Sequence, residues 1–197
     1  MTVLSAPTVA LSEHGGQIRP DGAQGVLHAD VRVLSQAVLA LDGAEPVPVS
    51  DGMLDSQTAR FAAVPRALGD GIVDPTVRVE RTRSVTAGEV SESIRVVSFA
   101  DSGVATGLTL AVAADLADLA DINSGRTAAA PVPPELTGGG LTWGRGQLRV
   151  TLSAPGASFE VSAADPPGAV IRWQVRVAGR GEHKVGWRLS VADPEAV

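Results

Sequence analysis

The stretch Val170-Ile171-Arg172-Trp173-Gln174-Val175-Arg176-Val177 alternates apolar and polar side chains with a period of two. The alternation returns after a short gap, with apolar side chains at Val185, Trp187, Leu189 and Val191. A two-residue period is typical of a β-strand with one buried and one solvated face. The connector Ala178-Gly179-Arg180-Gly181-Glu182 is rich in turn residues, so we predict an antiparallel hairpin here.

The same alternation continues along most of the chain. Further strands are predicted at Val33–Leu41, Thr58–Val64, Thr76–Val85, Val90–Phe99, Val104–Ala113, Leu148–Leu152 and Ser158–Ala163. Short turn dipeptides separate many of them, such as Asp42-Gly43 and Ala87-Gly88, and strands joined by short turns are antiparallel. One-sided strands bury their apolar faces by packing sheet on sheet. We therefore predict an all-β fold, a large antiparallel, supersandwich-like β-sandwich that forms a single domain over residues 1–197.

Two segments break this pattern. Residues 115–122 place Leu116, Leu119 and three aspartates at helical spacing, which predicts a short helical turn. Residues 127–140 are rich in Ala, Pro and Gly, which indicates an exposed loop.

Composition limits the function classes. The chain has 197 residues, no cysteine, and 22 acidic against 16 basic residues, for a net charge of −6. The absence of a basic cluster argues against nucleic acid and anionic membranes as partners. The N-terminus lacks the charged and apolar regions of a secretory signal, so we expect a cytoplasmic protein.

Motifs for catalysis and cofactor binding are missing, and we expect neither catalytic residues nor a cofactor in this chain. His14, His28 and His183 stand in unrelated settings, without a nucleophile motif or a phosphate-binding glycine loop around them. The spacing of Asp115, Asp118 and Asp121 invites a calcium site, but it lacks the glycine and the terminal glutamate of a calcium loop. A solvated helix face is favoured, and no metal site is predicted.

The three tryptophans are the only large candidates for sugar stacking. Trp173 and Trp187 lie in apolar alternation, which favours core packing. Trp143 is flanked by Gly144 and, after Arg145, by Gly146, and we expect its ring to be the most exposed of the three. A role at the edge of the core remains an equal alternative for it.

Three elements together resemble a known family. They are Gly25–Ser35 with Asp30, Arg32, Leu34 and Ser35, the charged strand Arg78–Arg83, and Ala114–Arg126 with its repeated Ala-Asp pattern. In order and spacing they are similar to the N-terminal domain of bacterial glycogen debranching enzymes of the amylo-α-1,6-glucosidase type. Val31 replaces the family's threonine, and Leu and Ala replace its aromatic residues in the third element.

The resemblance implies a non-catalytic β-sandwich that packs on an (α/α)₆ catalytic domain of the same enzyme and shapes its glucan cleft. The candidates for that contact surface are Asp30, Arg32, Asp118, Asp121 and Arg126. For Asp30 and Arg32 the alternative is a structural pair that stiffens the start of a strand. An isolated domain would also leave its contact patch exposed, which predicts weak self-association.

Two further hypotheses come from other classes. A free-standing carbohydrate-binding module would use Trp143 to stack on an α-glucan. A stand-alone glycosidase would show turnover by this chain alone.

Overall fold

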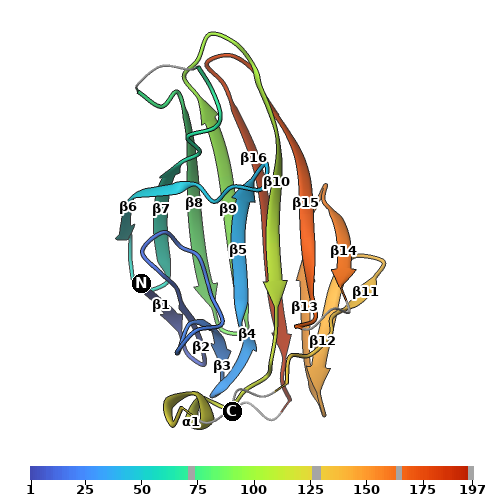
Figure 1. Cartoon of the computed structure of the whole chain (residues 1–197). Helices are drawn as coiled ribbons and strands as arrows, with labels where there is room; N and C mark the ends of the chain where they lie inside the picture. The colour runs from blue at the N-terminus through green and yellow to red at the C-terminus, as the bar shows by residue number, and fades with distance from the viewer. Residues whose placement is uncertain (71–73, 126–129, 163–165, 195–197) are drawn as a thin grey trace.

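The computed structural model describes residues 1–70, 74–125, 130–162 and 166–194, and nearly all of its regular structure is β-strand (Figure 1). The strands are β1 (Thr2–Ser5), β2 (Thr8–Leu11), β3 (Gly25–His28), β4 (Val31–Leu34), β5 (Gln36–Leu41), β6 (Val47–Met53), β7 (Thr58–Val64), β8 (Val77–Thr86), β9 (Glu89–Ser98), β10 (Val104–Ala113), β11 (Glu135–Thr137), β12 (Gly140–Arg145), β13 (Leu148–Ser153), β14 (Ser158–Ser162), β15 (Gly168–Val177) and β16 (Glu182–Ala192). One short helix, α1 (Leu119–Asn123), lies at the lower end of the view in Figure 1.

The strands form three antiparallel sheets. The largest has eight strands in the order β11-β12-β13-β16-β9-β8-β7-β6, and two four-stranded sheets have the orders β14-β15-β10-β5 and β1-β2-β3-β4. Figure 1 shows β5, β10 and β15 in front of β8, β9 and β16. Strand β8 buries alternate residues on one face only, and β1 and β2 contact it, so the smaller sheets cover one face of the eight-stranded sheet. The predicted β-sandwich is confirmed.

The apolar side chains that recur every two residues fill the space between the layers. Trp173 and Trp187 are only 2% and 3% exposed and belong to one continuous apolar core, as the alternation predicts. The polar partners Arg172 and Arg176 on β15 are exposed. Burial of the large side chains in this core supplies most of the driving force for folding.

The predicted hairpin at residues 170–191 is wrong in one respect. Strand β15 pairs with β10 and β14, whereas β16 pairs with β9 and β13. The connector at 178–181 therefore arches from one layer to the other instead of joining two neighbours in a sheet. Both strands are apolar on one face, and the arch turns these faces toward each other across the core.

A second predicted strand, Val33–Leu41, is divided. Its first part ends β4 at Leu34 and its second part begins β5 at Gln36, and the two belong to different sheets. Ser35 lies between them and donates its N–H to the carbonyl oxygen of Ala113 at 2.9 Å. Strand β10 thereby holds the point where the chain passes from one small sheet to the other.

The two irregular segments also differ in detail from the prediction. The helical turn begins at Leu119, later than the expected residue 115. Residues 127–129 of the expected loop lie outside the described residues. Within 130–140, Glu135–Thr137 forms β11 at the edge of the large sheet, and Gly138-Gly139 makes the turn into β12.

A buried ionic cluster interrupts the apolar core. Glu92 on β9 accepts hydrogen bonds from Arg81 Nε and Arg83 Nε on β8, both at 2.8 Å. Arg83 Nη2 also donates to the carbonyl oxygen of Gly16 at 2.6 Å, and Arg81 Nη1 donates to Gln17 Oε1 at 2.9 Å. The cluster thus fixes the loop around Gly16 against β8.

The charges within the cluster depend on one another. Burial pushes the pKa of Glu92 upward, but the two guanidinium charges and their hydrogen bonds outweigh it, so the pKa lies below its ordinary value. The Arg83 guanidinium also lies over the Phe61 ring, with its Cζ 5.3 Å from the ring centroid. The charged strand Arg78–Arg83 therefore directs two of its arginines, Arg81 and Arg83, into the interior.

Glu92→Gln should destabilise the domain by about 3–5 kcal/mol, because it leaves two buried arginines without a counter-charge. Chemical denaturation measures the free energy of unfolding. Glu89→Gln on the same strand is the matched control. It removes a 3.4 Å ion pair with Arg188 that is more than a third exposed on both sides, and it should cost less than about 1 kcal/mol. Equal losses for the two variants would contradict a structural role of the cluster.

Candidate functional site

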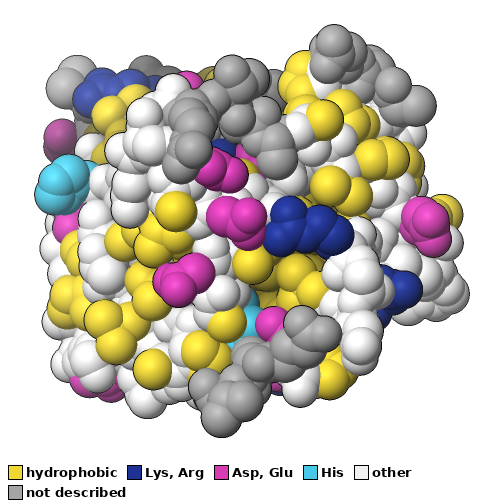
Figure 2. All heavy atoms as spheres, turned by 90° about the horizontal axis from the view of Figure 1, so that it is seen from below, with side chains coloured by type: hydrophobic (Ala, Val, Ile, Leu, Met, Phe, Trp, Pro, Cys, Tyr) yellow, Lys and Arg dark blue, Asp and Glu magenta, His cyan; other side chains and the backbone are white. Residues whose placement is uncertain are grey.

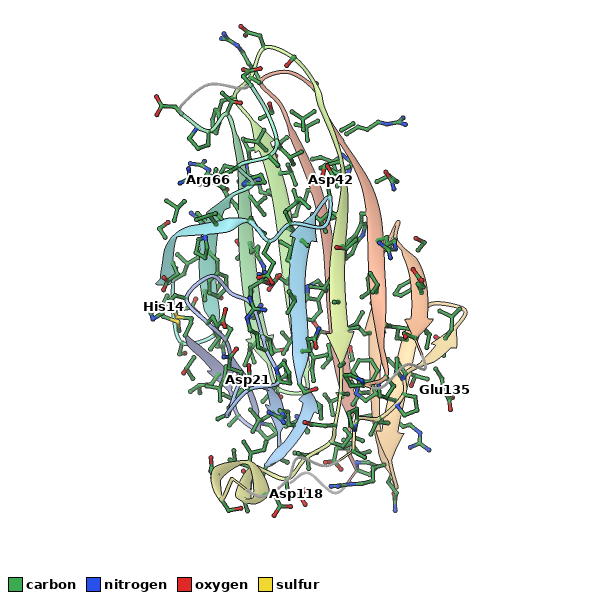
Figure 3. All side chains as sticks on the ribbon, viewed as in Figure 1. His14, Asp21, Asp42, Arg66, Asp118 and Glu135 are labelled. Atoms are coloured by element: carbon green, nitrogen blue, oxygen red, sulfur yellow. The ribbon has the colours of Figure 1, made fainter. Side chains whose placement is uncertain are left out.

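The β3–β4 turn and the α1 segment meet at the lower end of the sandwich. Val31 forms an isolated antiparallel bridge with Asp118, and Leu119 donates its N–H to the carbonyl oxygen of Asp30 at 2.8 Å. Figure 3 shows Asp118 at this end, next to α1. Two of the three sequence elements that carried the family resemblance are therefore neighbours in space.

The conformation of the β3–β4 turn places Asp30 on the surface. Ala29 and Asp30 have φ values of 44° and 67°, the pair of positive φ angles that a tight two-residue hairpin requires. Aspartate tolerates this conformation better than most residues. Asp30 is exposed, and its carboxylate is available to a partner or ligand.

Arg32 is an interior residue. Its side chain is 2% exposed and forms a two-point ion pair with Asp115, in which Nε donates to Oδ1 at 3.1 Å and Nη2 contacts Oδ2. Nη1 donates to the carbonyl oxygens of Gly22 and Gln24 at 3.0 and 3.2 Å. Arg32 therefore lies beneath the proposed contact surface, and its carboxylate partner is Asp115 instead of Asp30.

The surface at this end has two hollows on either side of Val31. One, of about 390 Å³, is lined by the β3–β4 turn and by α1 with Asp118, Leu119 and Asn123. The other, of about 460 Å³, is lined by Arg145, Gly146, Gln147, Leu148 and Asp193. Arg145 Nη2 lies 3.0 Å from Asp118 Oδ1, and both side chains are more than half exposed. Figure 2 looks onto this end and shows hydrophobic side chains in its middle with charged side chains around them.

We refer to these two hollows, with Asp30, Asp118, Arg145 and Asp193 around Val31, as the lower-end site. Carboxylates accept hydrogen bonds, and an arginine donates several in a fixed geometry. The apolar middle adds area that a partner can bury. The lower-end site can therefore bind a polar surface or a hydroxyl-rich ligand.

His28 lies behind the site, in an arrangement that involves Thr8 and Asp193. Thr8 Oγ1 accepts the N–H of Gly88 at 2.8 Å and lies 2.9 Å from His28 Nδ1. Thr8 Oγ1 has a second lone pair and a proton, so it accepts from Nδ1 or donates to it according to the tautomer of His28. Burial lowers the pKa of His28, while the charge of Asp193 opposes this effect. Thr8 is completely buried, so its hydroxyl cannot reach a substrate.

Of the two alternatives for Trp143, an exposed ring and a role at the edge of the core, the structure shows the second. Trp143 is 5% exposed, and its Nε1 donates to the carbonyl oxygen of Val33 at 2.8 Å. Its flanking glycine, Gly144, serves close packing, since a Cβ there would come within 2.2 Å of the carbonyl oxygen of Leu148. The ring therefore belongs to the edge of the core, and its faces are not a stacking platform.

Two predicted contact residues remain, Asp121 and Arg126. Asp121 is half-buried in the first turn of α1, close to Asp118 in sequence, and Arg126 lies outside the described residues. In the part of the chain that the structure describes, no group of three His, Cys, Asp or Glu residues could hold a metal ion. No helix among the described residues has the length and apolar character needed to cross a membrane.

Sequence reasoning missed Arg145, Asp193 and His28. The Gly144-Arg145-Gly146 sequence marks a turn, which could have indicated that Arg145 projects from the end of a strand. No comparable sequence signal marks Asp193, because it reaches the site only through the position of β16, the strand directly before it.

Several solved structures share this fold. A galactose mutarotase related enzyme from Lactobacillus acidophilus matches with a TM-score of 0.57 at 9% identity, over 98% of this chain and 97% of that one. A galactose mutarotase-like protein from Clostridium acetobutylicum gives 0.58 at 7%, over 98% and 94%. A protein assigned as a kojibiose phosphorylase, from the human microbiome, gives 0.55 at 7%, with 89% of this chain covering 24% of that one. At these identities the likeness defines the class, a galactose mutarotase-like β-sandwich.

The family follows from the sequence comparison. A family model described as the N-terminal domain of some glycogen debranching enzymes matches residues 3–188. This chain therefore belongs to that family, as the resemblance indicated. No curated protein matches the chain by sequence.

Arg32→Met should destabilise the domain by about 3–5 kcal/mol, because it leaves the Asp115 carboxylate buried without its partner. Arg145→Met is the matched control: it removes an exposed ion pair and should cost less than about 1 kcal/mol. Denaturant titration of both variants gives the comparison. A loss below about 1 kcal/mol for Arg32→Met would show that the buried pair does not hold this end together.

The free energy of unfolding of the domain should decrease as the pH is lowered, because His28 titrates. Its folded pKa lies below the value of about 6.5 for an exposed histidine, so the unfolded chain binds more protons in the window below 6.5. The free energy of unfolding should therefore decrease as the pH drops through about 6.5 toward the folded pKa, and His28 should contribute almost no pH dependence above about pH 7.5. His28→Gln should flatten the profile in that window, measured by denaturation at closely spaced pH values. An unchanged slope in the variant would contradict this assignment.

Proposed function

We propose that this domain is a non-catalytic part of a debranching-type glycoside hydrolase, and that it packs with its lower-end site on an (α/α)₆ catalytic domain and forms one wall of the glucan cleft. Membership of the family of debranching-enzyme N-terminal domains supports the kind of parent enzyme. The match to 24% of a much longer phosphorylase chain supports the idea that this fold works as one domain among several.

The observation that carries the proposal is the meeting of two family elements at one end of the sandwich. Asp30 from the first element and Asp118 from the third line the same hollow, although 88 positions separate them in sequence. Exposed charges around an apolar centre are the arrangement expected of an interface rim around a buried core. The mixed signs of Arg145 and the carboxylates allow pairing with both kinds of charge on the partner.

Association with the separately expressed (α/α)₆ domain of the parent enzyme tests this function. Asp118→Lys should weaken the affinity by about tenfold or more, because it reverses a charge within the contact surface. Glu160→Lys is the matched control, since Glu160 on β14 forms an exposed ion pair with Arg172 on β15 at the same 3.0 Å distance. Its affinity should stay within about twofold of the unmodified domain, as measured by titration calorimetry. Absence of a complex, or equal effects of both variants, would refute the proposed contact.

The alternative is a free-standing carbohydrate-binding module. Two mutarotase-like structures favour it, because this chain covers nearly the whole length of each of them. In those two structures the fold occurs without the long additional part of the phosphorylase chain. Saturable binding of maltooligosaccharides to this chain alone, followed by calorimetry, would support this alternative. Burial of Trp143 removes the platform that such a module would use.

A further inference from the structure

A second feature lies in the eight-stranded sheet, where β13 ends before its neighbour β16. The β13–β16 pairing runs from Arg149 and Ala192 to Ser153 and Arg188 and stops there. Strand β16 continues to Glu182 and remains paired with β9 along this length. Figure 1 shows β13 beside only the lower part of β16. Among the described residues, the segment of β16 from Glu182 to Trp187 is therefore a free edge of the large sheet.

The backbone groups that face this edge follow from the ladder. In an antiparallel sheet, successive residues direct their N–H and C=O groups alternately to the two neighbouring strands. Val191 donates to the carbonyl oxygen of Gly88 at 2.7 Å, and Gly181 accepts from the N–H of Ser98 at 2.9 Å, so the odd-numbered residues face β9. Lys184 and Gly186 therefore direct both an N–H and a C=O toward the side that β13 leaves open.

A groove of about 610 Å³ lies at this edge. Its walls are formed by Ser91 and Ser93 of β9, Ser153 and Pro155 at the exit of β13, and Lys184, Gly186 and Arg188 of β16. Gly186 packs so closely on β9 that a Cβ there would come within 2.6 Å of the carbonyl oxygen of Glu92. The missing side chain keeps the middle of the groove open.

The groove has a surplus of positive charge and of hydrogen-bond donors. The Lys184 ammonium makes no ion pair within the described chain, whereas Arg188, which is 60% exposed, pairs with the partly exposed Glu89 at 3.4 Å. The carboxylate of Glu182 on the same segment of β16 pairs with Arg95, so the unpaired charge here is the positive charge of Lys184. Trp187 contributes to the lining of the groove, but its indole is 3% exposed and belongs to the core, where Nε1 has no hydrogen-bond partner among the described residues. This local surplus contrasts with the net charge of −6 for the whole chain.

We infer that this groove, which we call the β16 edge groove, binds an extended peptide with acidic side chains as an additional strand next to β16. Alternating N–H and C=O groups are satisfied together only by another extended backbone, which is the basis of recognition by strand addition. Lys184 and Arg188 lie four residues apart on the same face of β16, and they select carboxylates on the matching face of the added strand. The inference does not depend on the lower-end site or on its partner.

An acetylated and amidated eight-residue peptide in which glutamate alternates with valine is the probe. Its binding to the full chain, followed by NMR, should protect the amides of Lys184 and Gly186 from hydrogen exchange, since both become hydrogen-bonded. Lys184→Glu should weaken this binding by about tenfold or more, and rising salt should weaken it further. The same peptide with lysine in place of glutamate should bind at least about tenfold more weakly than the acidic one.

Arg176→Glu is the matched control, because Arg176 is an exposed arginine on β15 in the other layer, without an ion pair in the described chain. It should change the affinity less than about twofold. Equal affinity for the acidic and basic peptides, or saturation of the acidic peptide without protection of the two amides, would overturn the inference. Binding of glutarate alone with the affinity of the peptide would also overturn it, in favour of a simple anion site. Failure of the lower-end association would leave this result unaffected.

Discussion

The buried ion pair between Arg32 and Asp115 is the interaction on which the lower end of the molecule depends. Arg32 on β4 reaches a residue just past the end of β10, and the same guanidinium holds the carbonyl oxygens of the loop before β3. Asp115 also accepts the N–H of Ala117, two residues before the start of α1. One pair of side chains therefore connects a loop, a strand and the segment that leads into the helix.

This connection explains why surface residues at that end have defined positions. α1 has only five residues and none of them is buried, so it cannot hold its place by its own packing. The bridge from Val31 to Asp118 and the hydrogen bond from Leu119 to Asp30 position it against the β3–β4 turn. Both contacts lie close in sequence to Arg32 and Asp115. The positions of the exposed carboxylates of Asp30 and Asp118 therefore depend on an ion pair that is buried from solvent.

The sequence predicted the elements better than their partners. The two-residue period identifies β15 and β16 correctly, because each strand has one apolar face. It cannot tell whether the connector at 178–181 closes a hairpin or arches between layers, since both arrangements bury the same residues. The same limit applies at Ser35, where a continuous alternation crosses from one sheet to another.

The candidate site shows a related limit. The family resemblance predicts Asp30 and Asp118 as contact residues, and the structure places them together. Arg32 came with them, but its burial depends on Asp115, which is 83 residues away, and on carbonyl groups that carry no signal in the sequence. The glycines around Trp143 suggested an exposed ring, whereas Gly144 is small because β13 packs closely against it. Local composition does not distinguish these two uses of glycine.

The unequal widths of the layers account for where binding features occur. A sheet of eight strands faces two sheets of four, and several connections pass between the layers, so strands end beside neighbours that continue. Where β13 ends, β16 keeps backbone groups without a partner strand in the described part of the chain. Where β10 ends, the chain turns through Asp115 into the lower-end site. Within a layer, backbone groups are satisfied by neighbouring strands and side chains alternate between the core and solvent. Groups that remain available to a partner therefore concentrate at the points where a strand leaves its sheet, and both sites proposed for this domain lie at such points.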